Sequence, residues 1–245
     1  VERVLGLHDA LGRLNEKRAA GSGRIIQIEQ GTQPALVFEG LSIASPDGAT
    51  ITKPFSAEIG PGEKVAISGD PDTAFKFLKV VAGLWPWGSG RLILPASGPL
   101  FFMPRRPYLP LRTLCAAVTY PAAPQEFGEN AVAVALTRVG LEHLIPELEK
   151  SGRWGETLSE DEQQRLGFAR LLLFNPGWVF MQETLDTLAP ETRESMLRLL
   201  GEELSGATFI IVGREPEATS FATAGIEFAE GGAVESRGLR HGQAT

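Results

Sequence analysis

Hydrophobic and polar residues follow two different patterns along the chain, one typical of strands and one typical of helices. Short runs rich in Ile, Val, Leu and Phe predict strands. They lie at 25–28, 36–43, 64–68, 100–103, 178–182, 207–212 and 226–229. Helical spacing of apolar residues predicts helices at 73–84, 159–174 and 190–204, and residues 108–157 are also rich in helix signals. Strands alternate with helices in the second half, which predicts an α/β fold with a mostly parallel sheet.

The two ends of the chain differ from this body. Val4, Leu7, Leu11 and Leu14 form one apolar stripe, so residues 1–18 are predicted to be a short amphipathic helix. The chain begins at Val1 rather than Met, and we expect that it is a fragment of a longer polypeptide. A frayed terminal helix is the alternative interpretation of these first residues.

Composition narrows the class of protein. The chain has 245 residues, is 43% hydrophobic, and carries 23 Lys and Arg against 30 Asp and Glu, a net charge of −7. This is a globular composition, and its acidic balance argues against nucleic acid as the main partner. The single cysteine excludes an internal disulfide framework, and three histidines leave little for a metal cluster. No run approaches 18 apolar residues, so no membrane span is predicted.

The loop after the strand at 64–68 is the first candidate for chemistry. Backbone N–H groups and a helix dipole hold phosphate in this place in nucleotide-binding α/β folds. The pattern G-x-x-x-x-G-K-[ST] is not matched, because only Gly69 is in place and Asp70 and Asp72 add carboxylates. A like charge at about 4 Å costs roughly 4 kcal/mol at an effective dielectric near 20, about a thousandfold in affinity. Taken alone, the loop is interpreted as a turn with Asp capping the helix; a phosphate site is the alternative.

Two further candidates lie in the second half of the chain. Ser159 with Glu162 three residues later is the pattern of a capping box, and Glu160 and Asp161 suit the positive end of a helix dipole. These preferences explain a stable helix start without any ligand. Glu183 ends an apolar strand, and catalytic carboxylates gather at the carboxyl ends of strands in open α/β sheets. One carboxylate does not by itself establish catalysis.

Three further segments, taken in order, carry a family resemblance. Residues 83–91 read GLWPWGSGR, residues 104–110 read PRRPYLP, and the run Leu158–Arg170 is followed by Pro176 and Glu183. Together they resemble the nucleotide-binding domain of ABC transporters. The first two are similar to the fused permease–ATPase branch that contains peroxisomal fatty-acyl and bacterial cobalamin or peptide transporters.

The resemblance implies an organisation as well as a fold. The fold would be the P-loop NTPase-type ABC ATPase fold, with a parallel core sheet, an antiparallel β-lobe and a helical lobe at about 108–160. Residues 1–23 would be a connector or the end of a transmembrane helix. The nucleotide-binding domain would occupy 24–236, and a flexible tail would occupy 237–245.

The resemblance also implies which positions would form the site. The phosphate-loop equivalent would consist of Gly69, Asp70, Pro71, Asp72, Thr73, Ala74, Phe75 and Lys76, with Ala74 about where the phosphate lysine belongs. The signature segment would consist of Leu158, Ser159, Glu160, Asp161, Glu162 and Gln163, with two acids where the family has glycines.

The remaining motif positions depart from the family pattern in a similar way. Arg105 stands in the coupling loop where the family has Gln, and Gln182 stands where the Mg²⁺-organising Asp belongs. Glu183 keeps the position of the catalytic base, and Arg214 replaces the switch His. The resemblance therefore implies that no metal ligand is retained.

These departures from the family motifs determine what activity we expect of the chain. The family implies ATP and Mg²⁺ as cofactors, a permease domain and a second nucleotide-binding domain as partners, and a place at the cytoplasmic face of a membrane. Phosphoryl transfer depends on positioned charge, so we expect an ABC-type domain with impaired ATP binding and hydrolysis. Two alternatives stay open: an active ATP-hydrolysing domain in which Arg105 and Arg214 compensate, and a non-transport interaction scaffold.

Overall fold

The structure is a computed structural model that describes residues 25–96, 98–128, 130–213 and 221–239. The expected helix at 1–18, Arg214, and residues 240–245 of the expected tail lie outside the described residues. The chain divides into two compact units, which are described separately. The first runs to Ile59 and includes Gly69–Ala96 and the chain from Glu227 onward; the second comprises Gly60–Ser68 and Ser97–Ile226.

The first unit is built on a four-stranded sheet with the order β1-β5-β2-β3. Its strands are β1 (Gln27–Gln30), β5 (Gly88–Leu94), β2 (Leu36–Ile43) and β3 (Phe55–Ile59). Strand β2 is antiparallel to both of its neighbours, and its register shifts between Phe38 and Leu41. Leu36, Phe38, Leu41 and Ile43 are fully buried. This arrangement confirms the expected antiparallel β-lobe.

Helix α2 (Pro71–Val81) belongs to the same unit. Proline is favoured in the first turn because its missing N–H is not needed there, and the helix stops before Gly83, which has a left-handed φ of 72°. The expected range of 73–84 was therefore displaced by two residues at the start and three at the end. Phe77 packs between the rings of Phe38 and Phe228, at centroid distances of 5.3 and 5.5 Å.

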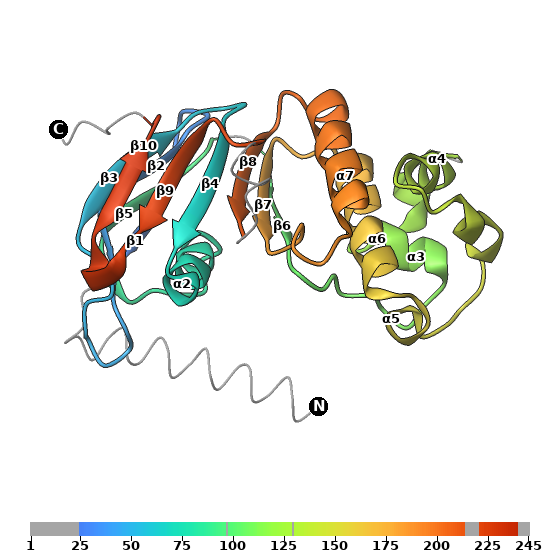
Figure 1. Ribbon diagram of the computed structural model, residues 1–245, viewed down its shortest axis with the longest axis horizontal. Helices are drawn as coiled ribbons and strands as arrows, with labels where there is room; N and C mark the ends of the chain where they lie inside the picture. Colours follow the sequence, from blue (N-terminus) through green and yellow to red (C-terminus); the bar gives the residue numbers. More distant parts are fainter. Residues whose placement is uncertain (1–24, 97, 129, 214–220, 240–245) are drawn as a thin grey trace. The chain divides into compact units, whose positions relative to one another are not determined.

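The second unit contains the parallel strands of a six-stranded sheet with the order β10-β9-β4-β8-β7-β6 (Figure 1). The strands in the second unit are β4 (Lys64–Gly69, except Gly69), β6 (Leu100–Met103), β7 (Trp178–Gln182), β8 (Thr208–Val212) and the first part of β9 (Ala224–Phe228). Strand β10 (Val234–Arg237) belongs to the first unit. Strands β4, β8, β7 and β6 pair in parallel. The expected parallel core sheet is confirmed, with β6 and β7 at the predicted residues.

Helices cover this sheet and extend away from it. Helices α6 (Glu160–Phe174) and α7 (Pro190–Glu203) lie beside the strands, and the smaller helices pack on α6 (Figure 1). The smaller elements are α3 (Leu114–Thr119), η1 (Pro124–Glu126), α4 (Ala131–Arg138), η2 (Glu142–Glu147) and α5 (Trp154–Thr157). They form the expected helical lobe. At Gly167 helix α6 packs closely on the sheet, and an added Cβ would lie 2.9 Å from the terminal methyl of Met103.

Three strands are not predicted by the sequence pattern. Strand β5 begins with glycines that are unfavourable in strands, and Gly90 is required there because an added Cβ would lie 2.3 Å from the Gly40 carbonyl oxygen. Strand β3 has only five residues, so its alternation of polar and apolar residues is too short to predict a strand. Strand β10 ends at Arg237, which was expected to be the first residue of the flexible tail. That residue belongs to the sheet instead.

Candidate functional site

The phosphate-loop equivalent begins with a glycine whose role is packing. Gly69 has a φ of 94°, and an added Cβ would lie 2.1 Å from the Phe228 carbonyl oxygen. The next amide, that of Asp70, donates to the same Phe228 oxygen at 2.9 Å. Contact between two backbone segments is sufficient to require glycine at this position.

Asp70 caps helix α2 with its own carboxylate. The Oδ2 atom accepts hydrogen bonds from the Thr73 amide at 2.8 Å and from the Thr73 hydroxyl at 2.6 Å. These two bonds hold the pKa of Asp70 below its ordinary value. Pro71 has no N–H and the Ala74 amide donates to the Asp70 carbonyl, so at most the Asp72 amide is left for an outside anion. The capping interpretation of this loop is confirmed.

The side chains that follow in α2 are engaged by their neighbours. Ala74 is buried and carries no charge. Lys76 forms an ion pair with Asp72 one turn earlier, and its Nζ lies 5.8 Å from the centre of the Trp85 ring. Phe75 is half-buried beneath the Nζ of Lys79, which lies 4.1 Å from the ring centre. The ammonium group nearest the helix start is therefore paired with a carboxylate from the same helix.

Within the second unit, Glu183 lies directly after strand β7. Its amide donates to the Val212 carbonyl at 2.6 Å, and its backbone has a left-handed φ of 48°, which is uncommon for a residue other than glycine. The carboxylate Oε2 lies 3.4 Å from Nη1 of Arg105. Gln182, the last residue of β7, pairs with Val212 in the sheet. Glu183 is therefore held at a defined place with a guanidinium beside its carboxylate.

The signature segment forms the start of helix α6. Ser159 is its N-cap, with its hydroxyl 3.2 Å from the Glu162 amide, and the Glu162 carboxylate accepts from the Ser159 amide at 2.9 Å. This confirms the predicted capping box. Burial alone would raise the pKa of Glu162. Hydrogen bonds from Ser159 and His143 have the larger combined effect, so its pKa lies below the ordinary value. Leu158 is buried, and Gln163 donates to the Leu158 and Gly155 carbonyls rather than facing outward.

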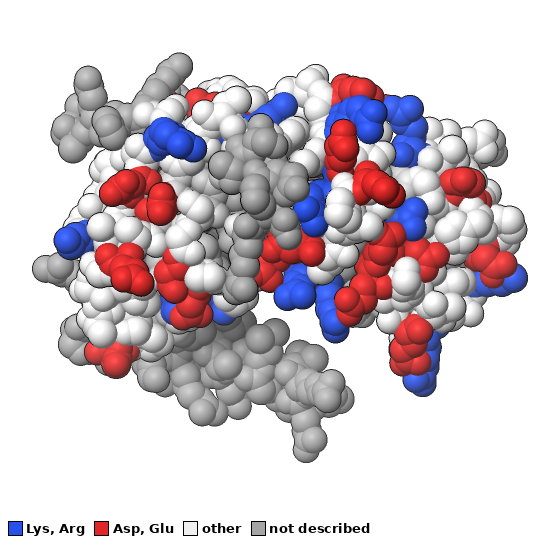
Figure 2. All heavy atoms as spheres, viewed as in Figure 1, with Lys and Arg blue, Asp and Glu red and all other residues white. Residues whose placement is uncertain are grey.

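Each acid of this segment has a partner within the second unit. Glu160 pairs with Arg106, Asp161 with Arg165 at 2.7 Å, and Glu162 with His143 at 2.9 Å. Figure 2 shows acidic and basic side chains next to one another over the helices of this unit. Within the described ranges, no group of three or more His, Cys, Asp or Glu is placed to hold a metal ion.

Comparison with known proteins identifies the family. An ABC transporter ATP-binding protein of Haemophilus influenzae is 34% identical over 179 residues, which are 73% of this chain and 30% of that protein. The chain belongs to the ABC transporter ATP-binding proteins. The inner membrane ABC transporter ATP-binding protein YddA of Escherichia coli is 27% identical over 216 residues, 88% of this chain and 38% of that protein. No family model matches the chain.

Further relatives extend the family to eukaryotes and support its fold. ATP-binding cassette sub-family D member 3 of Homo sapiens is 31% identical over 176 residues, 66% of this chain and 26% of that protein. A bacterial Atm1-family ABC exporter with ATP bound matches the structure with a TM-score of 0.72 at 18% identity, over 86% of this chain and 41% of that chain. This ABC chain thus spans about a third of the length of the curated relatives. Among its described residues, no helix has both the length and the apolar character to cross a membrane.

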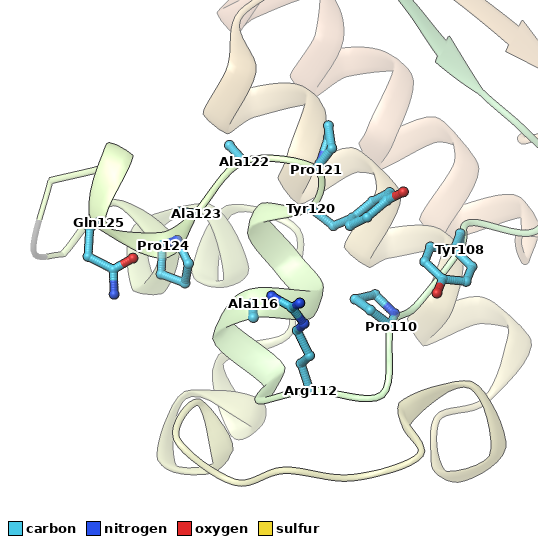
Figure 3. A pocket seen from close by; sticks show the side chains of 10 residues that line it. All are labelled: Tyr108, Pro110, Arg112, Ala116, Tyr120, Pro121, Ala122, Ala123, Pro124 and Gln125. Atoms are coloured by element: carbon cyan, nitrogen blue, oxygen red, sulfur yellow. The ribbon is translucent and has the colours of Figure 1, made fainter. Parts of the chain in front are cut away.

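A groove in the helical lobe of this ABC domain was missed by the sequence analysis. It encloses about 610 Å³ and begins three residues after Arg105. Figure 3 shows Tyr108, Pro110 and Tyr120 together at one end and Gln125 at the other. The two tyrosine rings meet edge to face at 5.1 Å and are 62% and 40% exposed. Exposed aromatics among prolines are a signal that could have pointed to this surface.

Arg170 of helix α6 donates hydrogen bonds to the backbone of two segments that form this groove. It is 7% exposed and donates to the carbonyls of Tyr108 and Ala117, each at 2.6 Å. Its guanidinium carbon lies 5.7 Å from the centre of the Tyr120 ring. Burial lowers the pKa of Arg170 to about 10. The groove is therefore attached to the same helix that carries the signature segment.

Proposed function

We propose that this chain is the nucleotide-binding domain of a membrane transporter and that it has lost tight binding and hydrolysis of ATP. The observation that carries the proposal is the pair of hydrogen bonds that Thr73 donates to Asp70. A helix N-terminus binds phosphate through its first amides and its dipole. In α2 a carboxylate of the same chain already uses these donors.

The start of α6 supports the same conclusion. Glu162 returns to the Ser159 amide, and Glu160 and Asp161 add two further carboxylates in the first turn. A phosphate brought to this helix would meet three acids in the first turn, two of them where the family pattern has glycines. Arg106 and Arg165 pair with Glu160 and Asp161, and the His143 ring lies beside Glu162, so these side chains add no net positive charge to the helix start.

ATP and Mg²⁺ do not fit the residues present. The Thr73 hydroxyl, the nearest one to the helix start, is bonded to Asp70. Gln182 offers an amide where the family uses a carboxylate, and Glu183 is paired with Arg105. Hydrolysis needs preorganised positive charge around the phosphates and the metal, and removing one such donor typically costs about a hundred- to a thousandfold in rate.

The partners follow from the family and from the groove. We infer that a permease domain, in the same or an associated chain, contacts the Tyr108–Tyr120 groove beside Arg105, and that two nucleotide-binding domains pair as a homodimer or heterodimer. The groove supports this because it presents aromatic and proline side chains to solvent. The E. coli relative is an inner membrane ABC transporter ATP-binding protein, which supports a place for this chain at the cytoplasmic face of an inner membrane.

ATP turnover tests the proposal. We expect no Mg²⁺-dependent hydrolysis above background from the purified chain or from the transporter that contains it, and no change on Glu183→Gln substitution. The active alternative, in which Arg105 and Arg214 compensate, instead predicts measurable turnover that Glu183→Gln abolishes while nucleotide stays bound. Purification of the full protein from membranes, rather than from the soluble fraction, separates both transporter hypotheses from a non-transport scaffold.

A further inference from the structure

The segment from Arg105 to Pro107 is tied down at several points within the second unit. The Arg105 carbonyl accepts a hydrogen bond from the amide of Gln164, whose side chain is 1% exposed. The Arg105 side chain reaches Glu183, and the Arg106 side chain reaches Glu160 at the start of α6. Two consecutive guanidinium groups thus diverge to two different carboxylates.

A small cavity lies beside this segment. The cavity bordered by Arg105, Arg106, Glu160 and Thr187 measures about 10 Å³, which is the lower limit for a single water molecule. The neighbouring groove that begins at Tyr108 is some sixtyfold larger, as the two volumes show. The space beside the chain therefore widens within a few residues, from a small gap under Arg105 and Arg106 to the groove at Tyr108.

We propose that the Arg105–Glu183 and Arg106–Glu160 contacts form a salt-sensitive latch that holds residues 105–107 against α6 and keeps the Glu183 carboxylate paired with a guanidinium. This inference deepens the proposed function and rests on it for its biological meaning: the latch stabilises the inactive arrangement of the site. Its physical basis is separate, because both contacts join residues of this chain to one another.

The strength of the latch follows from its exposure. The Arg106 and Glu160 side chains are 76% and 64% exposed, and the Arg105 and Glu183 side chains are 58% and 24% exposed. Exposed ion pairs contribute about 0.2–1 kcal/mol each and weaken as salt is added. Loss of one pair should therefore increase the open fraction of the segment by about 1.4- to fivefold, since 1.4 kcal/mol corresponds to a factor of ten.

Trypsin provides a direct readout, because a protease needs an extended backbone around the Arg105–Arg106 bond. The contacts with Gln164, Glu183 and Glu160 oppose this rearrangement. We expect Glu160→Gln to speed this cleavage about 1.4- to fivefold without changing the sequence around the bond. Glu156→Gln is the matched control: Glu156 pairs with Arg153 at 3.2 Å with both side chains 71% exposed, on α5, away from the bond. This control should leave the rate unchanged.

Added salt tests the same latch in the unmodified chain. Raising the ionic strength should speed cleavage in the wild type and have a smaller effect in Glu160→Gln, after division by the rate for a free peptide of residues 101–109. Equal rates for wild type and Glu160→Gln, or equal salt effects in both, would overturn the latch. ATP is left out of every arm, so ATP binding by the wild type would contradict the proposed function and leave this result intact.

Discussion

Asp70 and Thr73 are joined by two hydrogen bonds at the start of α2, one from the amide at 2.8 Å and one from the hydroxyl at 2.6 Å. One carboxylate oxygen receives both of them. The Asp70 carboxylate stabilises the helix start in the way that a bound anion would. The same hydrogen bonds that stabilise the helix therefore leave its Thr73 donors unavailable to an outside anion.

Removing this cap should destabilise the first unit. Asp70→Ala is expected to lower the free energy of unfolding by about 0.5–2 kcal/mol, because the Thr73 amide and hydroxyl lose their acceptor. Asp70→Asn keeps an acceptor and should cost less. Urea unfolding followed by circular dichroism measures both; equal losses in the two variants would show that the cap is not the cause.

The two capping carboxylates predict how stability depends on pH. Asp70 and Glu162 both have a pKa below the ordinary value, so the folded chain binds fewer protons than the unfolded chain when the pH falls below about 4. Their contribution is present above the unfolded pKa and is lost as the pH falls through the folded pKa. In the double variant Asp70→Asn, Glu162→Gln, urea midpoints between pH 5 and 3 should fall less steeply than in the wild type. An unchanged slope contradicts this account.

Arg170 should be among the most sensitive positions of the helical lobe. Arg170→Met leaves the carbonyls of Tyr108 and Ala117 without their donor, and we expect a loss of about 2–4 kcal/mol. Arg138, whose ion pair with Glu203 is exposed, is the matched control, and Arg138→Met should cost under about 1 kcal/mol. Thermal unfolding of both variants compares them, and similar losses would argue against a structural role for the buried guanidinium.

The sequence predicted those features that depend on neighbouring residues. The apolar run 178–182 gave strand β7 with the correct ends, and the Ser159–Glu162 spacing located the start of α6 to within one residue. The Asp70 cap was also recognised, since all of its atoms lie within four residues. Local hydrogen bonding and periodicity were sufficient in each case.

Features that depend on distant contacts could not be predicted. Arg106 and Glu160 are 54 positions apart and meet only after the segment from Arg105 packs on α6. The pairing of Glu183 with Arg105 spans 78 positions and likewise needs the order of β6 and β7 in the sheet. Strand β5 was hidden because its glycines are required by backbone contacts that no local pattern reveals.

Relief of the cap should restore some affinity for nucleotide. Asp70→Gly removes both the charge and the acceptor at a small cost to the helix, and it frees the Thr73 amide and hydroxyl. Because a hydrogen bond to a charged group contributes about 1.5–3 kcal/mol, Mg-ATP should bind this variant about tenfold or more tightly than the wild type. Asp72→Asn removes an equal charge two positions away without freeing Thr73, and it should bind less tightly than Asp70→Gly.

Equilibrium titration of the wild-type chain with Mg-ATP is the most direct test of the central claim. With the helix start already occupied by Asp70, the dissociation constant should exceed about 1 mM, equivalent to a binding free energy weaker than about −4.1 kcal/mol. Saturable binding with a dissociation constant of about 1 μM or below, abolished by removal of Mg²⁺, would contradict it.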